Sequence, residues 1–193
     1  MDTIDVTALM LGIDREARPE VQRAMNDIAE MGDSGSPAGL VQMMREAIAV
    51  LRGVRRHWTH AGVENTRPMP EAKAEGRFAA LTKKARRRFE EETIRNKDGV
   101  ITRGDASPLP PSDVPGVVVV TLVVAARQEL LDVADVRDGA QLERAFDGLM
   151  GVGADDFVAM EVIWSPSDEN DRATSAMVEA KYPELTRLSS GRA

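Results

Sequence analysis

The chain has 193 residues, a formal net charge of −7 and no cysteine. The lack of cysteine excludes disulfides, thiolate metal sites and a cysteine nucleophile, and the negative charge repels nucleic-acid backbones and anionic membranes. Aromatic residues make up only 4% of the chain, so we expect no base-stacking surface and no nucleic-acid partner.

The chain opens with a predicted strand over residues 3–13, where apolar side chains alternate. Asp14 then begins a helix that the Gly32–Gly35 segment ends. A second helix begins at Ser36 and Pro37, because a hydroxyl cap followed by proline is typical of a helix start. Apolar residues spaced four and three apart predict that this helix continues to Ala61. They are Leu40, Met44, Ala47, Leu51, Val54, Trp58 and Ala61.

A third helix is predicted from about Glu71 to Ile94, with an apolar stripe that includes Phe78 and Leu81. Residues 36–94 would therefore form a helical arm. Residues 96–116 are rich in proline and glycine, and this composition predicts a linker.

The C-terminal half, residues 117–193, is predicted to be rich in strands. The continuous β-branched run at 117–125 is typical of a central strand covered on both faces. A short strand at 130–133 is close enough to form a hairpin with it. A helix over 138–149 and a last strand over 157–164 follow.

This order of elements resembles the split βαβ plan of ferredoxin-like sheets. We expect one α+β domain over residues 1–193, with an antiparallel sheet and helices on one face. The first and last strands would lie beside the central run, and the helical hairpin at 36–94 would enlarge the first crossover.

No segment is typical of a membrane span or a secretion signal. The longest apolar run, Val114–Ala126, is shorter than the about 18 residues that a span needs. The N-terminus lacks the basic region and apolar core of a signal peptide. We expect a cytoplasmic protein without a membrane span.

Several segments in order carry a family resemblance: Ser36–Leu40, Glu46 to Trp58, Ala74 to Leu81, Arg86–Thr93, Val118–Ala125, Glu161–Pro166 and Tyr182–Leu185. Through these segments, nearly the whole chain resembles the domain-of-unknown-function family 1517, which is found in cyanobacteria, chloroplasts and some other bacteria. In that family the domain typically follows a membrane-spanning or glycine-rich segment. The resemblance implies no reaction and no catalytic residue.

The two histidines, His57 and His60, lie three residues apart on the predicted second helix, and Glu64 follows. Such a row could contact one metal ion. The alternative is a solvated helix face beside Trp58, and we favour this alternative. We therefore expect no metal and no cofactor.

The charged residues of the third helix predict surface ion pairs. The basic run Lys83–Arg88 is followed by Glu90–Glu92 at a spacing that pairs charges along a helix. Glu75, Arg86 and Glu92 form a candidate polar cluster. The sequence places no nucleophile or oxyanion donor opposite these carboxylates, so we expect no catalytic residue.

The sequence favours a non-catalytic protein-interaction or regulatory module that binds a protein partner or a second copy of itself. The alternative is a small-ligand-binding protein or an enzyme, with a cleft between the helical hairpin and the sheet. The polar cluster would line that cleft together with Arg52 and Trp58. The candidate interaction surface is Leu40, Leu51, Arg52, Val54 and Trp58.

Overall fold

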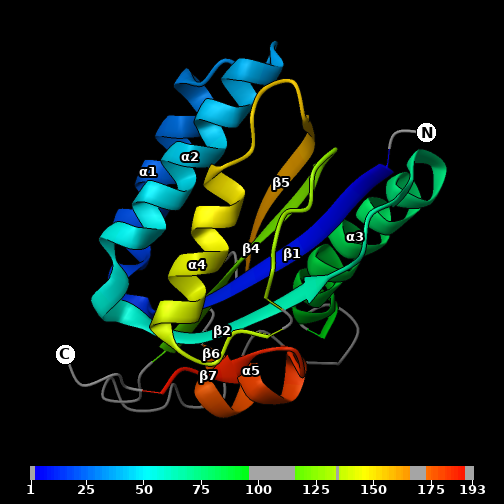
Figure 1. The fold of residues 1–193 in the computed structure, drawn as a ribbon. Coiled ribbons are helices and arrows are strands. Elements are labelled where there is room, and N and C mark those ends of the chain that lie inside the picture. The colour runs from blue at the N-terminus through cyan, green and yellow to red at the C-terminus, as the bar shows by residue number, and fades with distance from the viewer. Residues whose placement is uncertain (1–2, 96–115, 134, 166–172, 190–193) are drawn as a thin grey trace.

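The structure is a computed structural model, and it describes residues 3–95, 116–133, 135–165 and 173–189. Within these ranges a seven-stranded antiparallel sheet has helices on both faces (Figure 1). The expected α+β class with an antiparallel sheet is confirmed. None of the helices in these ranges has the length and apolar composition to cross a bilayer.

Two long strands form the centre of the sheet, β1 (Thr3–Asp14) and β4 (Gly116–Ala126). β2 (Trp58–Asn65) pairs with the free side of β1, and β5 (Phe157–Ser165) pairs with the free side of β4. Every residue of β4 is buried, because its continuous apolar run is covered on both faces. Three two-residue strands complete the sheet: β3 (Met69–Pro70), β6 (Ala173–Thr174) and β7 (Thr186–Arg187).

Three helices cover the first face, α1 (Arg18–Met31), α2 (Pro37–Gly53) and α4 (Gly139–Met150). As predicted, Ser36 caps α2, with its Oγ accepting the N–H of Gly39 at 3.0 Å. The apolar stripes of these helices pack on alternate side chains of β1 and β4. They form the largest core of the described chain.

Two separate helices cover the second face, α3 (Glu71–Arg95) and α5 (Ser175–Lys181). α3 packs over one half of this face, which includes Val6 and Val123. α5 and the turn after it pack over the other half, where Met10 is buried. The expectation that helices cover one face only is therefore wrong.

The predicted second helix is wrong beyond Gly53. Residues 55–57 form a short 3₁₀ helix, η2 (Arg55–His57), and β2 begins at Trp58. Residues 58–65 pair with β1, which gives their backbone N–H and C=O groups partners across the strand. This long-range pairing overrides the helical spacing of the apolar side chains, and it interrupts the expected helical arm.

The strand order β5-β4-β1-β2 confirms that the first and last long strands lie beside the central run. The ferredoxin-like order is not confirmed, because β1 and β2 are antiparallel neighbours rather than parallel strands separated by a third. The strand expected at 130–133 is wrong, since this segment is irregular. Of the expected linker, residues 96–115 lie outside the described residues.

Candidate functional site

The structure divides the candidate interaction surface between the core and solvent. Leu51 and Val54 are only 0% and 2% exposed and belong to the core of the first face. Leu40 and Trp58 are half-buried and pack against the same core. Arg52 is also half-buried. Solvent therefore reaches this surface at Leu40, Arg52 and Trp58.

Arg52 joins α2 to α4 through two carboxylates. Its Nε lies 2.8 Å from Oε2 of Glu143, and its Nη2 lies 2.5 Å from Oδ1 of Asp147. Its guanidinium group also lies 5.7 Å from the centre of the buried Phe146 ring. Sequence reasoning missed both acidic partners. The four-residue spacing of Glu143 and Asp147 in the sequence could have identified them, because it places both on the same side of α4.

Trp58 is fixed beside Arg52 by contacts on several sides. Its Nε1 donates a hydrogen bond of 2.9 Å to the carbonyl oxygen of Leu51, and its ring lies 5.8 Å from the Phe146 ring. The Arg55 guanidinium lies 5.8 Å from the Trp58 ring, and the Arg55 side chain is 62% exposed. We call the following residues the Trp58 corner: Arg52, Arg55, Trp58, Glu143 and Asp147.

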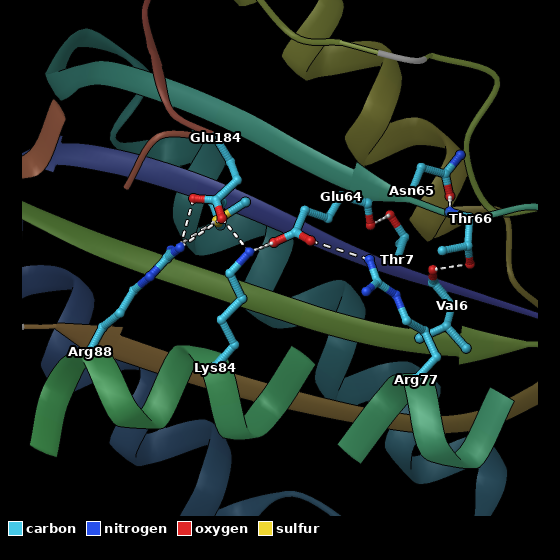
Figure 2. A network of polar contacts seen from close by, with 10 residues as sticks. Val6, Thr7, Glu64, Asn65, Thr66, Arg77, Lys84, Arg88 and Glu184 are labelled. Atoms are coloured by element: carbon cyan, nitrogen blue, oxygen red, sulfur yellow. Dashed lines mark hydrogen bonds and ion pairs between the residues drawn. The ribbon is translucent and has the colours of Figure 1, made fainter. Parts of the chain in front are cut away.

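A second charged cluster connects α3 to β2 on the other face of the sheet (Figure 2). Arg77 Nη2 lies 3.2 Å from Oε2 of Glu64, and Lys84 Nζ lies 2.6 Å from Oε1 of the same carboxylate. Arg77 and Lys84 are seven residues apart, so two helical turns bring both cations to the same side of α3. Glu64, a residue of β2, therefore neutralises positive charge on α3.

Glu184 extends this cluster to the C-terminal segment. Arg88 Nη2 lies 2.7 Å from both carboxylate oxygens, and Lys84 Nζ forms an ion pair with the same group. Although burial alone would raise the pKa of Glu184, hydrogen bonds from Lys84 and Arg88 lower this pKa to about 2. The Tyr182 ring lies 4.4 Å from the Arg88 guanidinium. We call the following residues the α3 ion network: Glu64, Arg77, Lys84, Arg88 and Glu184.

A buried carboxyl group lies on the first face of the sheet, where Asp5 pairs with Ala126 at the end of β4. Asp5 is 0% exposed, and its Oδ2 accepts the backbone N–H of Leu130 at 2.9 Å. Burial raises the pKa of Asp5 above its usual value. Asn65 Nδ2 donates to the carbonyl oxygen of Leu131 at 2.9 Å. These contacts hold the irregular segment after β4 against the sheet.

The candidate polar cluster is not brought together. Arg86 pairs with Glu161 of β5, with Nη2 and Oε1 2.6 Å apart. Glu75 is exposed three helical turns before Arg86, which separates them by about 16 Å along α3. The side chain of Glu92 lies outside the described residues.

The histidines do not form the helical row considered from the sequence. His60 lies in β2 and is 0% exposed, with Nδ1 3.0 Å from Thr59 Oγ1 and Nε2 3.3 Å from Glu179 Oε1. His57 lies in η2, where its Nε2 accepts a hydrogen bond of 3.0 Å from Arg56 Nε. The predicted row of ligands on one helix is wrong because α2 ends at Gly53, before either histidine.

Two cavities in the described residues lie around α1. An open groove of about 350 Å³ lies between α1 and α2, and its lining includes Met31, Met43 and Glu46. A cavity of about 10 Å³ lies between α1 and the sheet, beside Trp164. Neither is lined by the residues expected at a ligand cleft. Those residues are Arg52, Trp58, Glu75, Arg86 and Glu92.

Comparison with known proteins gives a family match and two curated relatives. The family described as "Protein of unknown function (DUF1517)" matches residues 3–188. Protein FLAP1 homolog A of Synechocystis sp. (strain PCC 6803) is 25% identical over 189 residues, which cover 94% of this chain and 56% of that protein. FLUCTUATING-LIGHT-ACCLIMATION protein 1, chloroplastic, of Arabidopsis thaliana is 27% identical over 180 residues, which cover 93% of this chain and 44% of that protein.

The chain thus spans about half the length of the curated relatives it matches. No solved structure matches the chain.

Proposed function

The chain belongs to the DUF1517 family of proteins of unknown function, and from this premise we propose that it is a non-catalytic module that binds a protein partner through the Trp58 corner. The observation that carries this proposal is the surface pair of Arg55 and Trp58, whose guanidinium and ring lie 5.8 Å apart. Tryptophan and arginine are the side chains most enriched among residues that dominate the binding energy of protein interfaces.

The surroundings of this pair support a binding role because they hold it in place before any partner arrives. The hydrogen bond to the Leu51 carbonyl fixes the Trp58 ring. Glu143 lies 3.4 Å from Arg55 and 2.8 Å from Arg52, so one carboxylate orients both cations. A side chain that is already ordered loses less conformational entropy on binding.

The name of the Arabidopsis relative concerns acclimation to fluctuating light. We extend a regulatory role to the region that this chain shares with it, and propose that the role is exerted through binding rather than through a chemical step. The cytoplasm remains our proposed location, because a cysteine-free, acidic chain is compatible with a reducing compartment.

The alternative of a ligand cleft between helices and sheet has less support. It would require Arg52, Glu75 and Arg86 to converge on one cavity. Arg52 instead pairs with α4, and Arg86 pairs with β5 on the other face of the sheet.

The proposal is tested by affinity purification of partners from the source organism with variants of the full chain. We expect Arg55→Glu and Trp58→Ala to lose a partner that the wild type retains. Arg23→Glu is the matched control, because it makes the same charge change at an exposed position of α1. If Arg55→Glu and Arg23→Glu retain the same partners as the wild type, the Trp58 corner is not the binding surface.

A further inference from the structure

Three side chains that can ligate a metal ion, from two distant segments of the chain, meet at one end of the sheet. Asp14 ends β1, Glu16 lies in the 3₁₀ helix η1 (Arg15–Ala17), and His57 ends η2. Each offers one donor atom, and the three atoms lie within 4.8 Å of one another. This set lies outside both the Trp58 corner and the α3 ion network.

A β-bulge between β1 and β2 brings the histidine to this position. Gly12 lies opposite His60, but the next residue, Ile13, lies opposite Trp58, so Thr59 is an extra residue on β2. His57 directly precedes Trp58, the residue opposite Ile13, so it lies beside the end of β1. Without the bulge, Asp14 would face Trp58. Bulges commonly redirect side chains at functional sites.

We propose that Asp14, Glu16 and His57 form a binding site for a divalent transition-metal ion such as Zn²⁺ or Mn²⁺. Two carboxylates and one imidazole are a ligand set that binds such ions and leaves coordination positions open for water. The backbone N–H of Glu16 donates to Asp14 Oδ1 at 2.9 Å, which orients this carboxylate. A bound ion would link the end of β1 to His57, the residue before β2.

Neighbouring arginines limit the affinity of this site without blocking it. Arg56 donates to Nε2 of His57, and an ion bound through this nitrogen displaces that guanidinium. The Arg56 side chain is exposed, so its charge stays in contact with water after displacement. Arg55 is paired with Glu143 at 3.4 Å, which offsets part of its charge.

The site is tested by titrating the tag-free full chain with Zn²⁺ at neutral pH while recording its histidine ring signals by NMR. The chain has two histidines, and His60 is the internal control because its ring is fully buried. We expect the His57 signal to shift and saturate at one Zn²⁺ per chain while the His60 signal stays in place. Calorimetry of the same titration supplies the dissociation constant.

Asp14→Asn and Glu16→Gln are each expected to weaken Zn²⁺ binding about tenfold or more, a loss typical of perturbed metal sites. Asparagine still caps a helix start, so Asp14→Asn removes the charge while retaining the cap. Glu30→Gln, at an exposed position of α1, should leave binding unchanged.

Three results would overturn the proposal: no shift of the His57 signal, equal Zn²⁺ affinity in wild type and both carboxylate variants, or wild-type affinity in His57→Gln. Equal affinity in the carboxylate variants would mean that zinc binds a lone surface imidazole.

Discussion

At the residue scale, Asp5 links the sheet to the segment that follows β4, and it does so as a carboxyl group removed from water. Its Oδ1 is buried, with no hydrogen-bond partner among the described residues. Leaving such an oxygen without a partner costs more when the group is charged than when it is protonated. Burial therefore acts against the charged form of Asp5 and raises its pKa.

We predict that the stability cost of Asp5 grows with pH. Since burial raises its pKa in the folded state above 3.8, its contribution to stability is fully present below pH 3.8. That contribution is lost as the pH rises through the raised pKa. Asp5→Asn removes this dependence, so the free energy of unfolding of the variant should rise relative to wild type between pH 4 and pH 8. Urea denaturation across this range measures the difference, and a constant difference would contradict the prediction.

Glu184 has the opposite pH dependence, because its pKa is lowered from 4.5 to about 2 in the folded state. Its contribution to stability is present above pH 4.5 and is lost as the pH falls toward 2. We predict that Glu184→Gln lowers the free energy of unfolding by about 1–2 kcal/mol at pH 7. The wild type and the variant should converge in acid. Glu30→Gln is the control, and an equal loss in both variants would show that the α3 ion network contributes nothing specific.

At the element scale, the C-terminal segment depends on close contact with β2. A Cβ atom added at Gly62 would lie 2.2 Å from the carbonyl oxygen of Glu184 and 2.8 Å from its carbonyl carbon. Both are backbone atoms, so a side chain at position 62 cannot be accommodated by a rotamer change. A glycine in this strand is thus explained by the close approach of another backbone.

We predict that Gly62→Ala lowers the free energy of unfolding by about 1–3 kcal/mol and displaces the C-terminal segment. The amide of Leu188, which donates to the carbonyl oxygen of Thr59 at 2.9 Å, should lose protection in hydrogen exchange. Gly76→Ala in α3 is the matched control, because a Cβ there meets nothing within 4 Å. It should stabilise the helix by about 0.5–1 kcal/mol. Unchanged protection of Leu188 in Gly62→Ala would contradict the account.

Elements whose signals are local could be predicted from the sequence. The start of α2 could be predicted because Ser36 caps the helix and Pro37 follows directly. The strand β4 could be predicted because its own run of β-branched residues favours a strand. The end of α2 could not be predicted, because pairing with β1 decides that residues 58–65 form a strand. Periodicity within one segment does not contain that information.

The candidate sites show the same limit. Arg52 and Trp58 were both singled out from the sequence, where they lie close together, and both lie beside the Phe146 ring, at 5.7 and 5.8 Å from its centre. Their partners Glu143 and Asp147, and the contact of Lys84 with Glu184, join segments far apart in the chain. Such pairs depend on the order of strands in the sheet, which the ferredoxin-like expectation did not reproduce.

At the scale of the whole molecule, the sheet separates the α3 ion network on one face from the Trp58 corner on the other. The second face is closed by α3 and the C-terminal segment, and the α3 ion network joins these two covers. The first face carries the helices α2 and α4 with the Trp58 corner at their exposed side. We assign stabilisation to the α3 ion network and propose binding for the Trp58 corner.

The most direct test of the proposed binding role is site-specific photo-crosslinking in cells of the source organism. A photoreactive amino acid replaces Arg55 in one variant and Arg23 in the control. We predict that one partner protein, or a second copy of this chain, crosslinks from position 55 and not from position 23. The same products from both positions, or none from position 55 in a folded variant, would contradict the account.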